Sequence, residues 1–133
     1  MDGKKKTTIL ILEDERQLAR AVREMFSQRG FEAIVVSRVG DGIKELQNRK
    51  RVDVIWLDHY LLGTENGLDF VVEVKNNPEW RSIPIFVVSN NASTTNIKSY
   101  IQLGVSNYYT KADYDISQII TDIEYAMTQA PVE

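Results

Sequence analysis

The stretch Ile-Leu-Ile-Leu-Glu-Asp-Glu at residues 9–15 decides the fold, because four apolar residues run directly into three acidic ones. A continuously apolar run of this length is typical of a β-strand that is covered on both faces, as in a parallel sheet. In open α/β sheets, ligands bind at the carboxyl ends of such strands. The stretch therefore predicts a buried strand and, directly after it, an acidic site at the edge of the sheet.

Further strand-length runs follow along the chain, at residues 33–36, 54–57, 85–88 and 107–110, and segments with helical spacing separate them. After the first strand, apolar residues at i, i+3, i+4, i+7 and i+8 predict a helix that buries Leu18, Ala21, Val22, Met25 and Phe26. Strict alternation of strands and helices predicts a parallel sheet with helices on both faces and right-handed crossovers. The expected fold is α/β, a doubly wound (βα)5 sandwich, and one strand order of such sheets is 2-1-3-4-5, the flavodoxin-like order.

Length and composition indicate one globular domain: the chain has 133 residues, of which 43% are hydrophobic and 26% charged. A net charge of −3 gives no reason to expect nucleic acid or a membrane as a partner, and no apolar run approaches the length of a membrane span. The absence of cysteine excludes disulfides and cysteine-based zinc sites. We expect a cytoplasmic domain at residues 8–129, monomeric or weakly dimeric, between a flexible basic tail at 1–7 and a short tail at 130–133.

The other strands also end in polar residues. Asp58 follows the third strand, Ser89 ends the fourth, and Lys111 follows the fifth. If the strand order is 2-1-3-4-5, the first and third strands are neighbours at the topological switch point. Glu13, Asp14 and Asp58 would then form one acidic cluster.

Such a cluster points to a metal-assisted reaction. Carboxylates at close range need a cation, and oxygen ligands without histidine or cysteine suit Mg²⁺. A Mg²⁺ ion held there can orient a phosphoryl donor while Asp58 attacks, since carboxylates serve as phosphoryl acceptors. Lys111 and Ser89 can each contact a phosphoryl oxygen. The set suits phosphoryl transfer, which needs mainly positioning and charge stabilisation.

Taken singly, these residues have simpler interpretations. Asp14 and Gln17 have the spacing of a helix capping box. Asp58 is harder to explain in this way, because an acid that ends a buried run is costly unless it is paired or lies at a rim. The simpler roles of a turn residue, a solvated lysine and an edge-strand aromatic remain open for Ser89, Lys111 and Tyr108.

Four motifs in order resemble the receiver domain of bacterial response regulators, the CheY-like family. They are Ile-Leu-Ile-Leu-Glu-Asp-Glu at 9–15, Val-Ile-Trp-Leu-Asp at 54–58, Ile-Pro-Ile-Phe-Val-Val-Ser at 83–89 and Tyr-Tyr-Thr-Lys at 108–111. The resemblance covers the chain from about Thr8 to Thr128. Each motif alone is weak to moderate, and the order and spacing of all four carry the resemblance.

The resemblance implies specific roles for the site residues. Asp58 would be the phosphoacceptor and, with Asp14, a Mg²⁺ ligand. Glu13 would act through a metal-bound water, and the backbone carbonyl of Tyr60 would complete the protein ligands. Ser89 would move toward the phosphoryl group, and the rotamer of one further residue, Tyr108, would report that move.

The resemblance also implies a signalling switch of the stand-alone, single-domain type rather than an enzyme, although the domain would assist its own phosphorylation and dephosphorylation. The phosphoryl donor would be a histidine kinase or a histidine phosphotransfer protein. The fourth helix, fifth strand and fifth helix would form the surface that binds a separate effector protein, with Ile97, Tyr100, Ile101 and Tyr108.

Departures from the family pattern support a second hypothesis, a phosphate-independent protein-interaction module. Leu62 and Ala112 stand where the family usually has proline, and Gly67 comes one residue late. Asn90 is larger than the small residue usual there, and His59 is interpreted as a loop residue beside the acceptor. A flavin carrier would need a Ser/Thr/Gly-rich loop after the first strand, and an aspartate-nucleophile phosphatase would need Asp-x-Asp; Glu-Asp-Glu-Arg provides neither.

Overall fold

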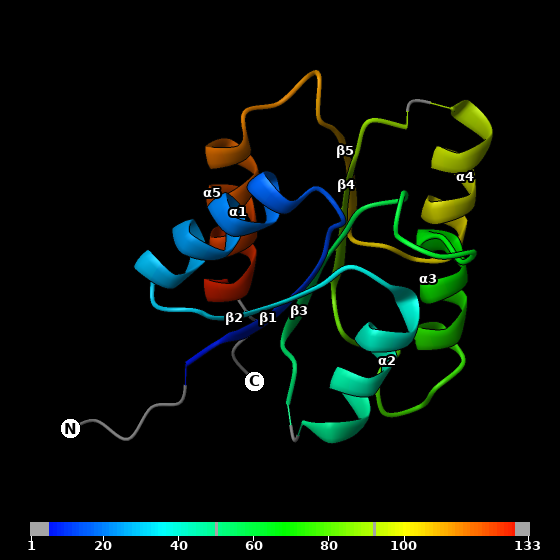
Figure 1. The fold of residues 1–133 in the computed structure, drawn as a ribbon, viewed down its shortest axis with the longest axis horizontal. Coiled ribbons are helices and arrows are strands. Elements are labelled where there is room, and N and C mark those ends of the chain that lie inside the picture. Colours follow the sequence, from blue (N-terminus) through cyan, green and yellow to red (C-terminus); the bar gives the residue numbers. More distant parts are fainter. Residues whose placement is uncertain (1–5, 50, 92, 130–133) are drawn as a thin grey trace.

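Five strands alternate with five helices in the computed structural model, which describes residues 6–49, 51–91 and 93–129 (Figure 1). The predicted alternation is confirmed. In chain order the elements are β1 (Thr8–Leu12), α1 (Arg16–Gln28), β2 (Glu32–Val36), α2 (Val39–Asn48), β3 (Val54–Leu57), α3 (Gly67–Lys75), β4 (Ile85–Ser89), α4 (Thr94–Gln102), β5 (Asn107–Thr110) and α5 (Ile116–Thr128). The predicted tails, 1–7 and 130–133, lie outside the described residues except for Lys6 and Thr7.

The strands form one parallel sheet of order β2-β1-β3-β4-β5, as predicted. β1 lies between β2 and β3, and Leu10 is in register with Ile34 on one side and Ile55 on the other. The direct pairing of β1 with β3 brings the residues that follow these two strands to neighbouring positions at the same edge.

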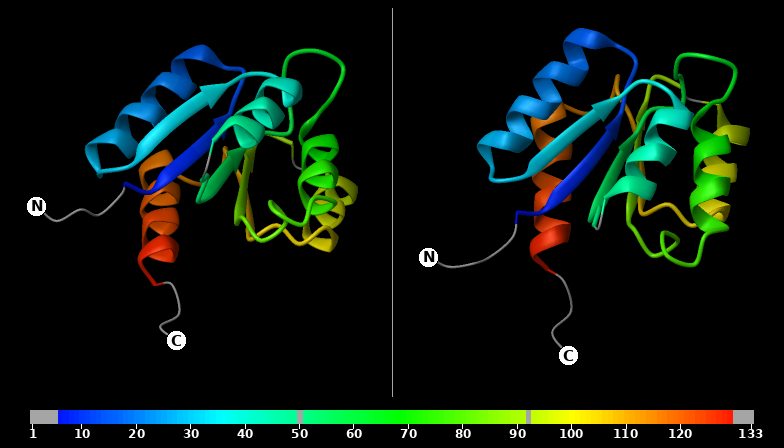
Figure 2. Two further views of the ribbon diagram at one scale, coloured as in Figure 1. Left: turned by 90° about the horizontal axis from the view of Figure 1, so that it is seen from below. Right: turned by 60° about the horizontal axis from the view of Figure 1, so that its bottom comes forward.

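Helices cover both faces of the sheet, with α1 and α5 on one side and α2, α3 and α4 on the other (Figure 2). Successive side chains of a strand point to opposite faces. Leu10 and Leu12 accordingly belong to the apolar cluster under α2, α3 and α4, whereas Ile9 and Ile11 pack with residues of α1 and α5. This two-sided burial is the physical reason for the continuously apolar run of β1.

One predicted core position in α1 is wrong. Ala21 is exposed, and Ala19 is buried together with Val22 and Phe26. Each residue of a helix turns the chain by about 100°. If Val22 is the centre of the buried face, Ala19 lies about 60° from it and Ala21 about 100°, so the smaller angle decides which alanine packs inward.

The helix starts differ in how they are capped. Glu15 is the N-cap of α1 and makes no side-chain capping bond, so the alternative capping box of Asp14 with Gln17 is not formed. Ser93 caps α4, and its Oγ accepts a hydrogen bond from Asn96 N–H at 3.3 Å. None of the helices in the described ranges is both long and apolar enough to cross a membrane.

Candidate functional site

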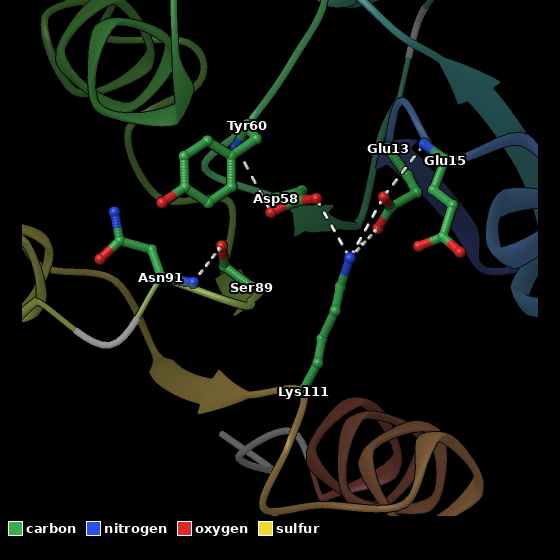
Figure 3. Close-up of polar contacts among 7 residues, drawn as sticks. All are labelled: Glu13, Glu15, Asp58, Tyr60, Ser89, Asn91 and Lys111. Carbon is green, nitrogen blue, oxygen red and sulfur yellow. Dashed lines mark hydrogen bonds and ion pairs between the residues drawn. The ribbon is translucent and has the colours of Figure 1, made fainter.

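The carboxyl ends of β1, β3, β4 and β5 meet at one edge of the sheet, and the side chains that follow them face one another (Figure 3). Carboxylate oxygens of Glu13, Asp14 and Asp58 all lie within 4.8 Å of one another. Glu13 and Asp58 are buried, and Asp14 is more open to solvent. The acidic cluster expected from the strand order is therefore present.

Lys111 joins the two buried acids. Its Nζ lies 3.1 Å from Asp58 Oδ2 and 3.1 and 3.2 Å from the two carboxylate oxygens of Glu13. The backbone holds this lysine in place, because Lys111 N–H donates to the Ser89 carbonyl at 2.9 Å and so continues the pairing of β5 with β4. A residue that follows an edge strand thus reaches the centre of the site.

Backbone hydrogen bonds also position the acids. Asp58 N–H donates to the Leu12 carbonyl at 2.9 Å, and Glu13 N–H donates to the Val36 carbonyl at 3.0 Å. Both bonds extend the sheet ladder by one residue beyond the strands. The Asp58 carboxylate receives a further, longer bond from Tyr60 N–H, at 3.4 Å. The acids consequently stand at the end of the sheet ladder rather than on a free loop.

The site carries more negative charge than its lysine balances. Burial, together with the neighbouring charge of Asp58, raises the pKa of Glu13 to about 7, and Lys111 opposes this only in part. Burial lowers the pKa of Lys111, but the charges of Asp58 and Glu13 outweigh it and raise that pKa overall. The cluster of three carboxylates therefore contains a single ammonium group, which contacts Glu13 and Asp58.

These residues fit a hard divalent cation such as Mg²⁺. Glu13 Oε1 is buried, and its contact with the Lys111 ammonium at 3.1 Å is an ion pair without the geometry of a hydrogen bond. The ligand atoms available are carboxylate oxygens, which Mg²⁺ prefers, and Asp14 leaves the cluster open to water on one side. An added cation would offset the excess negative charge of the cluster.

The two predicted switch residues converge on Asn91, a residue that the sequence did not single out. The buried Ser89 Oγ accepts a hydrogen bond from Asn91 N–H at 3.1 Å, and the Tyr108 hydroxyl donates to the Asn91 carbonyl. Asn91 Oδ1 in turn accepts from Ser93 N–H at 2.8 Å, an Asx turn leading into α4. An asparagine two residues before a serine N-cap was the available signal. Asn90, the residue weighed from sequence, is exposed.

The predicted effector surface needs a correction at Tyr100. This side chain is fully buried, and its hydroxyl lies 2.6 Å from Nδ1 of His59, which is also buried. The periodicity of α4 placed Tyr100 beside Ile97 and Ile101 without showing which of them faces the sheet. Ile101 is exposed, and Ile97 and Tyr108 are half-buried, so these three remain at the surface.

Burial shifts the proton affinities of both partners in this contact. It raises the pKa of the Tyr100 hydroxyl and lowers the pKa of His59. His59 thus lies in the loop after the acceptor, as expected, but points into the protein rather than toward solvent.

The departures from the family pattern are accommodated locally. Leu62 is exposed, and its N–H donates to the Ser37 carbonyl at 2.9 Å. Gly67 is the first residue of α3, which Asn66 and Asp69 cap with a capping box. The peptide bond between Lys111 and Ala112 is trans, as are the other bonds of the described residues.

Comparisons with known proteins identify the family of the chain. The response regulator receiver domain family matches residues 9–124. The sensory transduction protein RegX3 of Mycolicibacterium smegmatis is 32% identical over 119 residues, which cover 88% of this chain and 49% of RegX3. The chain thus spans about half of that relative. The chemotaxis protein CheY1 of Helicobacter pylori is 21% identical over 103 residues, which cover 77% of this chain and 83% of CheY1.

Solved structures share the fold. The phosphorylated cyanobacterial phytochrome response regulator RcpA superposes with a TM-score of 0.84 at 24% identity, covering 96% of this chain and 98% of that one. The Mn²⁺-bound form of response regulator Rcp1 gives 0.81 at 24% identity, covering 95% and 97%. With the family match over residues 9–124, the chain belongs to the response regulator receiver domain family of two-component signalling systems.

Proposed function

We propose that the protein is a phosphorylation switch in which Asp58 accepts a phosphoryl group in the presence of Mg²⁺. The observation that carries this proposal is the position of the Asp58 carboxylate. It is buried at the edge of the sheet, 3.1 Å from the ammonium of Lys111 and inside a three-carboxylate cluster that fits a divalent cation. A carboxylate with no further role in the fold would rarely be buried in this way, because its desolvation is costly.

The chemistry is a transfer from nitrogen to oxygen. An Asp58 oxygen attacks the phosphorus of a phosphohistidine, the P–N bond breaks, and an acyl phosphate forms on Asp58 as the histidine ring leaves. A bound Mg²⁺ would neutralise charge on the phosphoryl oxygens, and Glu13, Asp14 and Asp58 would hold it, with the Tyr60 carbonyl as a further ligand. The donor would be a histidine kinase or a histidine phosphotransfer protein.

The chain's own residues would stabilise the transferred group. The Lys111 ammonium, now shared between Asp58 and Glu13, can turn toward a phosphoryl oxygen without leaving the site. The Ser89 hydroxyl accepts a bond from Asn91 N–H and can donate its own proton to another phosphoryl oxygen. Such a movement would disturb the contacts of Asn91 with Ser89 and Tyr108, and so would bias the start of α4.

The signal would pass to a separate effector protein over α4, β5 and α5. Ile97, Ile101 and Tyr108 supply apolar area on this face, and Tyr108 also contacts Asn91 at the edge of the site. This residue set is the sequence-based one without Tyr100, which is buried.

Intact-mass measurement after incubation with Mg²⁺ and acetyl phosphate tests the proposal. We expect the wild type to gain one phosphoryl group, and the Asp58→Asn variant and a chelator-treated sample to gain none. Asp115→Asn is a matched control, because Asp115 is an exposed acid whose side chain makes no capping bond. If Mg²⁺ binds but neither acetyl phosphate nor a phosphohistidine donor labels the wild type, the proposal fails and the phosphate-independent interaction module is favoured.

A further inference from the structure

A buried polar contact ties α4 to the segment directly behind the acceptor carboxylate. Tyr100 on α4 and His59, the residue after Asp58, approach to 2.6 Å between Oη and Nδ1. Both side chains are buried, so water cannot replace this hydrogen bond if it is broken. The contact lies outside the acidic cluster and makes no use of Ser89 or Lys111.

Gly67 leaves no room for a side chain between the Tyr100 hydroxyl and the backbone of Asp58 and His59. A side-chain carbon at Gly67 would overlap this hydroxyl, and it would lie 2.9 Å from the Asp58 carbonyl oxygen and 3.1 Å from His59 Cα. Gly67 N–H also donates to the His59 carbonyl at 2.9 Å. The Tyr100 hydroxyl and the backbone of Asp58 and His59 thus all lie close to Gly67, so a shift of this backbone would reach Tyr100.

Tyr100 is also the main anchor of α4. Within Thr94–Gln102, all of which is described, it is the one buried side chain. Its ring packs edge-on against His59, with centroids 5.7 Å apart, and lies 5.6 Å from the ring of Tyr108. A helix held by so few buried groups opens easily, and its opening depends on the contacts of that anchor.

We propose that the His59–Tyr100 hydrogen bond is a coupling contact that transmits the charge state of Asp58 to α4, by a route separate from Ser89 and Asn91. A change of charge at Asp58 alters its attraction to Lys111 and its repulsion from Glu13, and therefore the position of the backbone at residues 58–59. His59 then either moves together with Tyr100 or loses the hydrogen bond to it, and both outcomes change the local unfolding equilibrium of α4. The use of this coupling in signalling rests on the proposed function, but the coupling itself needs only a change of charge at Asp58.

Hydrogen exchange of the α4 amides tests the coupling in a double-mutant cycle of wild type, Asp58→Asn, Tyr100→Phe and the double variant. One buried hydrogen bond corresponds to a change of about 2- to 10-fold in an equilibrium. We expect Asp58→Asn to change α4 exchange by a factor in this range when Tyr100 is present. In the Tyr100→Phe background we expect that factor to fall to near one.

Matched variants separate coupling from general destabilisation. Tyr109→Phe removes another tyrosine hydroxyl, which donates to Asp122 at 3.0 Å beside α5, and should leave the response to Asp58→Asn intact. Tyr108→Phe should also leave most of the response to Asp58→Asn, because the Tyr108 hydroxyl donates to the Asn91 carbonyl and not to His59. His59→Leu should abolish the response, and His59→Asn, which keeps a polar atom near the Nδ1 position, should retain part of it.

The proposal is overturned if Asp58→Asn changes α4 exchange by the same factor with and without the Tyr100 hydroxyl, or does not change it. It is also overturned if Tyr108→Phe, and not Tyr100→Phe, removes the response. The cycle involves no phosphoryl donor. If the α4 amides exchange as expected but the protein gains no phosphoryl group in the mass measurement, the proposed function is refuted and the coupling is not.

Discussion

Replacing Gly67 with alanine would place a methyl group into the closest packing behind Asp58. The new carbon would overlap the Tyr100 hydroxyl and lie 2.9 Å from the Asp58 carbonyl oxygen, which is backbone and cannot rotate away. Gly67 begins α3 and does not have a positive φ, so an alanine could adopt its backbone conformation. The expected cost therefore comes from packing and not from backbone strain.

The magnitude follows from two opposing effects. Insertion of a methyl group into a well-packed site costs about 1–3 kcal/mol, and the rigid neighbours here favour the upper end. Replacement of glycine by alanine in a helix raises the free energy of unfolding by about 0.5–1 kcal/mol. We expect Gly67→Ala to lower the free energy of unfolding by about 2 kcal/mol. Adding Tyr100→Phe removes one of the three close contacts, so the penalty of Gly67→Ala should fall by about 1 kcal/mol in that background.

Urea denaturation, followed by the fluorescence of the buried Trp56, measures these differences. Gly40→Ala is the matched control, because Gly40 lies in α2 and a side-chain carbon there would meet no atom within 4 Å. That variant should gain about 0.5–1 kcal/mol. If Gly67→Ala were as stable as Gly40→Ala, the close approach of Tyr100 and of the Asp58 backbone to Gly67 would be wrong, and the coupling contact would lose this support.

Three further predictions concern charge. Lys111→Met leaves two buried carboxylates without their cation, so the free energy of unfolding of the metal-free protein, measured with urea, should fall by about 3 kcal/mol. A loss below about 0.5 kcal/mol would contradict the buried ion pairs. Mg²⁺ at about 100 times its dissociation constant should stabilise the protein by about 2.7 kcal/mol, measured as a shift in Tm. An equal shift in the Asp14→Asn variant would argue against the acidic cluster as the Mg²⁺ site. Burial and the hydrogen bond with Asp122 raise the pKa of Tyr109 from 10.0 to about 12. Since the unfolded chain loses this proton first, stability should fall with rising pH between these values, more steeply than in Tyr109→Phe.

The general arrangement could be predicted from sequence because it depends on local patterns. Continuously apolar runs that alternate with helical periodicity predict parallel strands covered on both faces. Parallel strands end at one edge of the sheet, so the residues after β1, β3 and β5 had to lie there. Glu13, Asp58 and Lys111 follow from this rule without any knowledge of distances.

The sequence was less informative about α4. Its residues, Thr-Thr-Asn-Ile-Lys-Ser-Tyr-Ile-Gln, include few apolar side chains, so periodicity could not decide which face is buried. Tyr100 was therefore predicted at the surface, although it is the anchor of the helix. Asn91 was missed for a related reason, because its role depends on backbone hydrogen bonds with Ser89 and Tyr108 that no spacing rule indicates.

The sequence by itself determined a parallel α/β sheet and the edge at which the acids and the lysine gather, because apolar runs that alternate with helices predict parallel strands ending at one edge. Only the tertiary structure decided which polar atoms meet. Lys111 contacts both Glu13 and Asp58, and Tyr100 reaches across 41 positions of the chain to His59. Contacts of this kind depend on the rotation of each helix and on the space that neighbouring side chains leave, since a buried polar atom must find its partner wherever the packed core permits one.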